Sequence, residues 1–425
     1  MLTKPSLNSL EKTTRKSIFP SFLSVTVALL CLFAQEADCQ TPIEPVFRMG
    51  EALQPDEKKS SVGSWGHLEF YQLILEPSDY LLTFSSDFNK WKEGTVWKFS
   101  SLNREGIEVI LDNAGIDPSL REILVSEQHL THNPVSDLYE IRPPESVIIA
   151  LTSENRKLLY PRILPHNDQN PFLSPYALPV GGLGAVIYTP TGVPQKQLDL
   201  IQQLSYKMGN TTKFADINLV LAKAQDDTER WRILKTIRRE RSLSVNLRIT
   251  QQSNLLHLAN YWDASGKNRE VLPILESVVK TSGIETLDIV HLLPPTPRKL
   301  LHTYPSPDGY GLAKEMPDCY WTAASFFSEV PPDRYLDSID QVIENRYEKA
   351  APPLQLGDLI FMNDKKSGKA IHACNYIAAN LVYTKNGKSL GRPWIISTLE
   401  DVVSEYLSVE EMSIVFMRLR PQYKQ

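Results

Sequence analysis

Residues 317–327 read PDCYWTAASFF, and residues 370–378 read AIHACNYIA. In the first stretch Asp318 is typical of a helix N-cap, which places Cys319 in the first helical turn. The free N–H groups of a helix start stabilise a thiolate, so this position favours a cysteine nucleophile of lowered pKa. The alternative is a small buried cysteine in the core, since free cysteine is among the most buried residue types. In the second stretch His372 lies within an apolar run that predicts a buried strand.

The elements around these stretches indicate one helix that leads into a mostly antiparallel sheet, an α+β arrangement. The predicted helices and strands, in chain order, are a helix at 318–329, a polar helix at 333–350, strands at 356–362, 370–378 and 381–387, a helix at 398–407 and a strand at 412–420.

These C-terminal residues, about 115 in number, resemble the NlpC-type cysteine peptidases, papain-like enzymes that cut bacterial cell-wall peptides. Members usually read Asp-Cys-Ser-Gly-Phe at the nucleophile, Pro-Gly-Asp-Leu-Val-Phe-Phe on the next strand and His-Val-Gly-Ile-Tyr on the strand of the base. This chain has Asp318-Cys319, then LGDLIFM at 356–362, then HACNY from His372. The resemblance implies Cys319 as the nucleophile and His372 as the base.

The family's third polar residue lies on the strand that follows the base. Counting from His372 gives Thr384, whereas Asn386 is the better chemical choice because its amide oxygen accepts from an imidazole N–H. Asn386 also stands in Lys-Asn-Gly, a hairpin signal, so a plain turn residue is its alternative interpretation.

Departures from the family pattern concern the residues that would line the site. Tyr320 and Trp321 replace small residues after the nucleophile, and beside Asp318 they are expected to narrow the substrate-binding mouth. A tyrosine about a dozen residues before the cysteine often lines the family's site; Tyr310 and Tyr304 bracket that distance.

Cys374 replaces a family glycine two residues after His372. Side chains alternate along a strand, so His372, Cys374 and Tyr376 share one face, which we expect to meet the Cys319 helix. Cys319 is then either an active thiol or the partner of Cys374 in a disulfide that acts as a redox latch or marks an inactive domain.

The remaining chain divides into an exported leader and a larger N-terminal region. Residues 1–39 combine a basic start with a 17-residue apolar run at 18–34, which predicts a signal peptide or an uncleaved anchor and a periplasmic or extracellular location. Residues 40–64 are predicted as a polar lead-in linker. Residues 65–295 are predicted as an α/β region of one or two subdomains. Residues 296–425 form the NlpC-type domain, with a Pro-rich connector at 296–309.

Within 65–295 the sequence patterns predict both strands and helices. The expected strands are 67–77, 79–86, 94–102, 146–153 and 285–294; the expected helices are 117–130 with Asp117 as N-cap, 193–209 closed by Gly209, 212–242 and 268–283. The arginines from Arg230 to Arg241 are expected on a solvated helix face, with contact to an anionic polymer as the alternative.

Composition limits the class of partner. A net charge of -5 gives no basic surface for nucleic acid. His129 and His132 match no strong zinc pattern, and neither a metal nor another cofactor is implied.

We therefore expect an exported cysteine hydrolase that cleaves an amide bond, with a peptide or cell-wall substrate; the resemblance implies a peptidoglycan stem peptide. Membrane contact would occur only through the N-terminal anchor, and the sequence sets no oligomeric state. The alternatives are a non-catalytic binding or structural protein with a buried or bridged Cys319, and an amidase or acyltransferase on another substrate.

Overall fold

The computed structural model describes most of the chain beyond its N-terminal segment. The described residues are 58–83, 91–100, 103–163, 172, 175–209, 211–264, 266, 268–309, 316–329, 339–406 and 412–423. The predicted leader at 1–39, most of the predicted linker and Tyr310 lie outside them. None of the helices within the described ranges combines the length and apolarity needed to cross a membrane.

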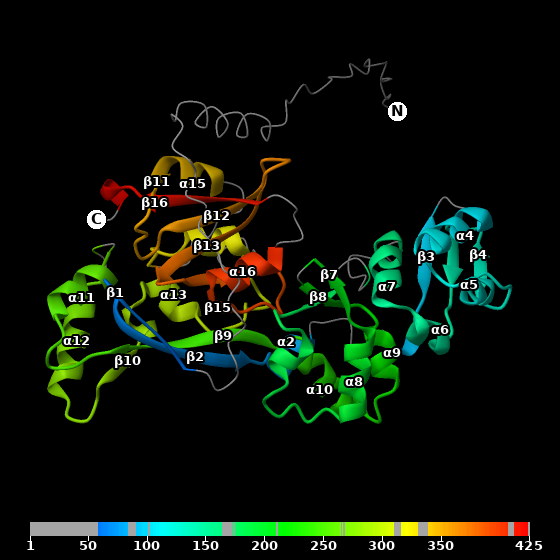
Figure 1. Cartoon of the computed structure of the whole chain (residues 1–425), viewed down its shortest axis with the longest axis horizontal. Coiled ribbons are helices and arrows are strands. Elements are labelled where there is room, and N and C mark those ends of the chain that lie inside the picture. Colours follow the sequence, from blue (N-terminus) through cyan, green and yellow to red (C-terminus); the bar gives the residue numbers. More distant parts are fainter. Residues whose placement is uncertain are drawn as a thin grey trace, which may run out of the picture.

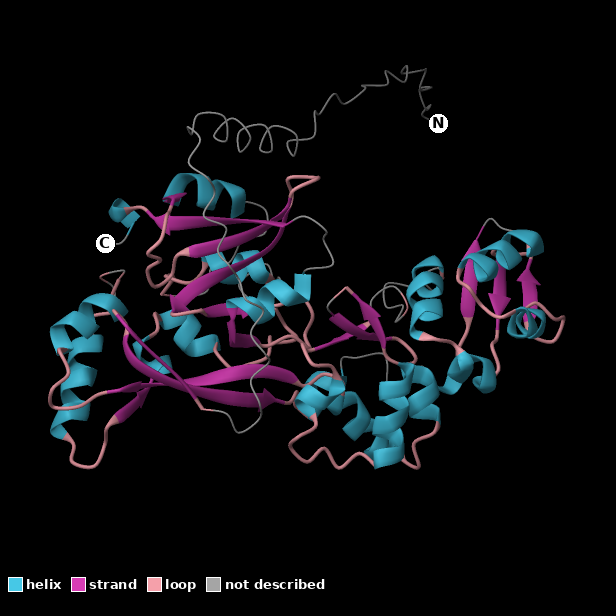
Figure 2. Cartoon of the chain, viewed as in Figure 1, coloured by secondary structure: helices cyan, strands magenta, loops and turns pink. Residues whose placement is uncertain are grey.

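A four-stranded antiparallel sheet forms the base of the molecule (Figures 1 and 2). Its strand order is β1 (Lys59–Gly63), β2 (Gly66–Leu75), β9 (Glu240–Arg248) and β10 (Thr286–Asp288). Helices α11 (Leu255–Trp262) and α12 (Val271–Lys280) cover one end of the sheet (Figure 1). Strand β1 lies within the segment predicted as a linker, and the strand expected at 285–294 shortens to β10 before the 3₁₀ turn η4 (Ile289–Leu292).

Residues 76–239 leave this sheet after β2 and return to it at β9. They contain two small antiparallel sheets, ordered β3-β5-β4 and β6-β8-β7. The strands are β3 (Trp97–Ser100), β4 (Leu130–Asn133), β5 (Leu138–Ile141), β6 (Tyr176–Leu178), β7 (Tyr206–Met208) and β8 (Thr211–Phe214). The helices are α2 (Asp79–Thr83), α4 (Arg104–Asn113), α5 (Pro118–Leu124), α6 (Glu145–Ala150), α7 (Ser153–Leu159), α8 (Gln195–Leu204), α9 (Ile217–Ala222) and α10 (Asp227–Thr236), with 3₁₀ turns η1 (Trp91–Glu93), η2 (Tyr160–Arg162) and η3 (Leu183–Val186).

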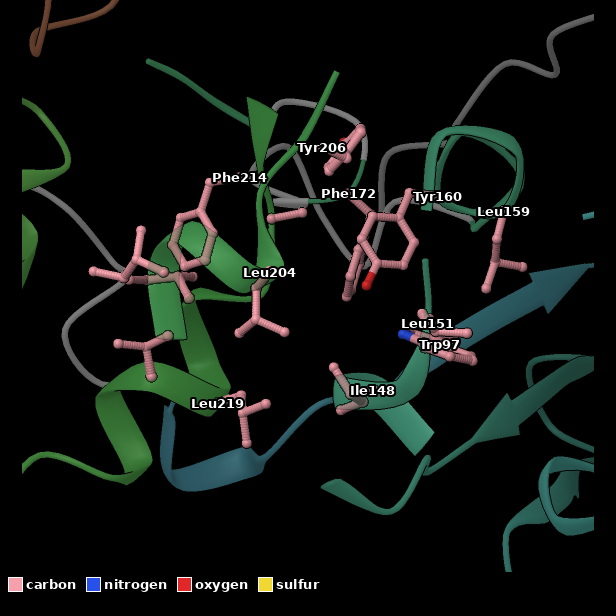
Figure 3. Packing of buried hydrophobic residues seen from close by; sticks show 14 of the residues in the cluster. Trp97, Ile148, Leu151, Leu159, Tyr160, Phe172, Leu204, Tyr206, Phe214 and Leu219 are labelled. Atoms are coloured by element: carbon pink, nitrogen blue, oxygen red, sulfur yellow. The ribbon is translucent and has the colours of Figure 1, made fainter. Parts of the chain in front are cut away.

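One hydrophobic cluster joins these pieces, and an aromatic group lies within it (Figure 3). The ring of Tyr160 packs edge-on against Phe172 and Tyr206, with ring centroids 4.8 and 5.6 Å away. The Tyr160 hydroxyl donates to the buried Asp216 carboxylate at 2.8 Å, and the Arg156 guanidinium also donates to that carboxylate. This buried polar group is fully paired, which suits a structural role.

Several predictions for this region were wrong, each for a local reason. The runs at 79–86 and 146–153 were expected as strands, but α2 and α6 form there. Short apolar runs do not distinguish a strand from a buried helix. Helix α8 ends at Leu204, and Gly209 (φ 60°) instead turns the β7–β8 hairpin. The cap of α5 is confirmed, because the Asp117 side chain accepts from the Ser119 N–H.

The arginine-rich stretch is not a solvated helix face. Helix α10 ends at Thr236, and Arg241 lies in β9. Arg230 and Arg239 are buried, and Arg239 donates to the Glu76 carboxylate at 2.8 Å and to the Val186 carbonyl. These cations tie elements together, because buried guanidinium groups need every partner that they can reach.

The C-terminal part is a six-stranded sheet in the order β11-β16-β12-β13-β14-β15, with only antiparallel ladders among the described residues. This confirms the α+β class, and the antiparallel ladders of 65–295 make that region α+β as well, not α/β in the parallel sense. The elements are α13 (Pro295–Leu300), α14 (Cys319–Ala324), α15 (Ile339–Arg346), β11 (Tyr347–Lys349), β12 (Leu359–Asp364), β13 (Ala370–Ala378), β14 (Leu381–Lys385), β15 (Trp394–Thr398), α16 (Leu399–Tyr406), β16 (Met412–Leu419) and η5 (Pro421–Tyr423). Strands β11 and β15 were not predicted.

The two sheets share one hydrophobic core across the predicted boundary at 296–309. Leu243 and Val245 of β9 belong to the same buried cluster as Trp394 and Ile396 of β15. The Ser242 hydroxyl also accepts from the Ile396 N–H at 3.1 Å. The connector itself is partly helical, as α13, so the first sheet and the C-terminal sheet pack as neighbours (Figure 1).

Candidate functional site

Helix α14 begins where the sequence predicted it. The Asp318 side chain accepts from the Trp321 N–H at 2.8 Å, which confirms the N-cap and makes Cys319 the first helical residue. The Asn375 side chain of β13 donates to the Ala323 carbonyl at 3.0 Å, and the Trp394 indole donates to the Thr322 hydroxyl at 3.0 Å. These contacts hold the helix against the C-terminal sheet.

The helix packs on the opposite face of β13 from the one expected. Ala323 shares a buried cluster with Ala373, and Asn375 reaches α14, whereas Cys374 packs in another cluster with residues of α16. The alternation along the strand was right. Both faces are covered, so the strand pattern alone did not tell which one meets the cysteine helix.

His372 is completely buried at this site. Its Nε2 lies 2.9 Å from the Thr384 hydroxyl, and the ring stacks on Tyr406 of α16, with centroids 4.4 Å apart and planes at 22°. Its Nδ1 has no hydrogen-bond partner. Burial lowers the pKa of His372 to about 3, so the imidazole is neutral at pH 7.

Thr384 is therefore the partner of the imidazole, as counting along the family pattern suggested. Asn386, the chemically preferred alternative, lies one step further out: the Thr384 hydroxyl donates to its Oδ1 at 3.4 Å. Its Nδ2 donates to the Glu405 carboxylate of α16. The β13–β14 ladder begins at the pair Asn375–Tyr383, so Thr384 reaches His372 as a diagonal neighbour.

Cys319 approaches the same strand from α14. The backbone of Ala373, the residue after His372, acts to lower the pKa of the thiol, and the Cys319 side chain is almost fully buried. The thiol does not hydrogen-bond the imidazole in this structure, because His372 Nδ1 has no partner. Burial and then the Asp318 carboxylate raise the pKa of Cys319 to about 11, while hydrogen bonds from Ala373 and Tyr320 act in the opposite direction. The lowered pKa expected from the helix start was wrong, because burial and the capping carboxylate outweigh the amide groups.

Cys374 and Cys319 are both free thiols in this structure. Cys374 is buried among Ile360, Met362 and Val382. Its pKa is raised by burial and then by the charge that Cys319 carries when ionised. The two thiols are not bridged, and Cys374 is best described as a core residue beside the site.

The residues expected to line the substrate mouth have different roles. Trp321 is buried in the shared core beside Trp394 and does not border an opening. Tyr320 is half-buried, and its hydroxyl donates to the Ala370 carbonyl at 2.6 Å. Tyr304 is largely buried, and burial and then Glu240 raise its pKa.

Three side chains near the site were missed. Tyr406 and Glu405 belong to α16. Lys385 of β14 is fully buried, and its ammonium group donates to the Ser389 carbonyl at 3.3 Å. Burial and then Arg392 lower the pKa of Lys385 to about 7. Nothing in the sequence pattern indicated a buried lysine, because lysine beside Asn-Gly is typical of an exposed turn.

Two hollows lie near the site without reaching its centre. A cavity of about 30 Å³ between the two sheets is lined by Gln72, Glu240, Asn386 and Glu405, among others. A larger one of about 380 Å³ lies at the far end of α14, beside Phe327. Neither is lined by Cys319 or His372.

Comparison with protein-family models, curated proteins and solved structures gave no match. Over the described ranges, no three His, Cys, Asp or Glu side chains are grouped as ligands of a metal ion. The case for a function therefore depends on the geometry around Cys319 and His372.

Proposed function

We propose that the chain is a cysteine hydrolase of papain-like fold, in which Cys319 attacks an amide carbonyl and His372 is the base. The state of the imidazole supports this most directly: Nε2 is held by Thr384, while Nδ1 is buried without a partner. A buried nitrogen without a hydrogen-bond partner destabilises the fold. One reason to retain such a nitrogen is that it must accept a proton during catalysis. The backbone of Ala373, the residue after His372, also acts on the thiol, whose pKa it lowers.

The shifted pKa values favour a neutral pair over a thiolate–imidazolium pair. With Cys319 near 11 and His372 near 3, both groups are uncharged at pH 7. Proton transfer would then accompany attack: the sulfur bonds to the carbonyl carbon as its proton passes to Nδ1 of His372. The amine departs with that proton and leaves a thioester. Water, deprotonated by the same nitrogen, then releases the acid and the free thiol.

Oxyanion stabilisation in this proposal comes from backbone N–H groups at the start of α14. Export through residues 1–39 extends the proposal on the leader pattern of the sequence, and a cell-wall peptide substrate extends it on the family resemblance. A substrate must also displace part of the cover over Cys319, whose exposed fraction is 6%.

The direct test is covalent trapping by a peptide bearing an electrophilic carbonyl, together with release of amine from amide substrates. We expect adduct formation at Cys319 in the native protein, loss of it in Cys319→Ser and strong slowing in His372→Ala. Cys374→Ser is the matched control, and it should still form the adduct. Equal trapping with and without His372 would count against the base assignment. Product analysis separates hydrolysis from acyl transfer.

The burial of both groups favours a second candidate, a non-catalytic binding or structural protein that keeps this fold. Cys319 and His372 are 6% and 0% exposed, and the raised thiol pKa suits an inert cysteine. In that case native Cys319 would stay unmodified by every electrophile that labels the unfolded chain, before and after mild reduction.

A further inference from the structure

A chain of hydrogen bonds leads from His372 to a carboxylate on another element. His372 Nε2 contacts the Thr384 hydroxyl at 2.9 Å, the Thr384 hydroxyl contacts Asn386 Oδ1 at 3.4 Å, and Asn386 Nδ2 contacts Glu405. The first three residues belong to β13, β14 and the turn after it, whereas Glu405 is in α16. The imidazole is thus connected to a charged group three links away.

The carboxylate sets the direction of every bond in this chain. An ionised carboxylate only accepts, so Asn386 must present its amide NH₂ group to Glu405 and its oxygen to Thr384. The amide oxygen also only accepts, so the Thr384 hydroxyl must donate to it. Because its one O–H donates to Asn386, the Thr384 hydroxyl must accept in its hydrogen bond with His372. Nε2 of His372 is therefore the protonated ring nitrogen.

We propose that Glu405 is a positioning residue that holds His372 in the Nε2–H tautomer and so leaves Nδ1 as the basic nitrogen. The tautomer assignment stands on the hydrogen-bond chain alone; its use in catalysis rests on the proposed function. In this tautomer the free lone pair is on Nδ1, and Nδ1 is also the ring nitrogen that has no hydrogen-bond partner.

Glu405 is itself held in place by charges from two other elements. Its side chain is 16% exposed, and its Oε1 lies 3.9 Å from Nη1 of Arg392, which precedes β15. Arg392 also pairs with Glu240 of β9, the strand at which the chain rejoins the first sheet. Burial lowers the pKa of Arg392, but the Glu240 and Glu405 carboxylates outweigh burial and raise that pKa, so the guanidinium stays charged. The first sheet therefore supports the group that orients the imidazole.

Tyr406, the next residue of α16, fixes the plane of the ring that Glu405 orients. Its ring stacks on His372 with planes at 22°, which restrains rotation of the imidazole about Cβ–Cγ and so keeps Nε2 at the Thr384 hydroxyl. One helical turn thus supplies both restraints: a stacked ring for the plane and a carboxylate for the proton. We assign α16 the role of the element that prepares His372.

Nitrogen NMR of protein labelled at its histidine rings tests this, with the His372 signals assigned by their loss in His372→Gln. We expect wild type to show only the Nε2–H tautomer, and Glu405→Ala to show a mixture with the Nδ1–H form. Glu405→Gln should keep the wild-type tautomer, because its amide oxygen still accepts from Asn386. Glu400→Ala is the matched control: Glu400 lies in the same helix and accepts from Asn380 instead.

Each outcome decides the assignment. Wild type in the Nδ1–H form, or a folded Glu405→Ala that keeps one Nε2–H tautomer, overturns it. If Glu405→Ala does not fold, the wild-type tautomer and the Thr384→Val spectrum still test the chain, since a valine leaves Nε2 without an acceptor. The measurement needs no turnover, so the tautomer assignment survives if Cys319 proves inert. A wrong tautomer would remove Nδ1 as the base, whereas trapping at Cys319 tests the nucleophile separately. Where Cys319 forms adducts, Glu405→Ala should slow adduct formation at least tenfold, and Glu405→Gln should restore it.

Discussion

The reactivity of Cys319 toward a small alkylating agent follows from its buried position. At pH 7 a thiol of pKa near 11 is ionised in about one molecule in 10,000, against about one in 100 for the ordinary value of 9.0. We therefore expect iodoacetamide to modify native Cys319 about 100-fold more slowly than an ordinary thiol, apart from any steric protection. The rate should rise about tenfold per pH unit from 7 to 10, without a plateau.

Asp318→Asn is the perturbation that isolates the electrostatic cause. Asparagine caps a helix as well as aspartate does, so α14 should remain, while the negative charge that raises the Cys319 pKa disappears. Alkylation should accelerate severalfold between pH 7 and 9, less than the full 100-fold because burial is the larger cause. His372→Ala should leave the pH dependence of labelling unchanged, since a neutral imidazole does not stabilise the thiolate.

The assay is a quenched time course with peptide mass spectrometry, carried out in Cys374→Ser so that only one folded-domain thiol reacts. A plateau with a midpoint below pH 8, shifted upward by His372→Ala, would refute this reasoning. Such a result would mean that the pair is ionised and that opening of the site, not its closed geometry, controls the chemistry. A rate in Asp318→Asn equal to wild type would refute the electrostatic part alone.

Three further predictions concern stability, measured by urea unfolding. The pKa of His372 is about 3 in the folded chain and 6.5 in the unfolded chain. The unfolded chain therefore takes up the proton first, so the free energy of unfolding is highest above pH 6.5 and falls as the pH drops toward 3. We expect a loss of about 2 kcal/mol between pH 7 and 5 that is absent in His372→Gln. Asp358→Ala should cost about 3 kcal/mol, because the nearly buried carboxylate accepts three hydrogen bonds from Arg418, at 2.9, 3.2 and 2.6 Å; an equal loss in Asp358→Asn would indicate that charge, not shape, is required. Gly357→Ala should cost about 2 kcal/mol, since φ is 84° and a new Cβ would lie 2.1 Å from the Phe327 ring; an unchanged midpoint would contradict the strain argument.

The sequence predicted the C-terminal elements better than the N-terminal ones, and the reason is local. Strand β13 was predicted with its observed bounds, 370–378, because turn residues flank its apolar run. The run at 146–153 has similar composition, yet α6 forms there with Pro144 as its N-cap and Glu145 in its first turn. Tertiary packing decides between the two states when a run is this short.

The candidate site was predictable in its chemistry but not in its surroundings. Residue types and order pointed to Cys319 and His372. Counting pointed to Thr384, whereas the chemical preference for Asn386 as the direct partner of the imidazole was wrong. Contacts between residues far apart in the sequence were not predicted. Glu405 follows Asn386 by 19 residues, and Glu240 and Arg392 are 152 residues apart. The burial of the Cys319 side chain could not be predicted from the sequence either. That burial raises the Cys319 pKa, where a lowered pKa was expected.

These long-range contacts change how the region at 65–295 should be regarded. If it were a separate recognition module, its interface with the C-terminal sheet would be polar and readily parted. Instead Leu243 and Val245 share a dry core with Trp394, so separating the sheets would expose a large apolar surface. Glu240, on the same strand, reaches through Arg392 toward the carboxylate that orients His372. The first sheet is therefore part of the structure that builds the site.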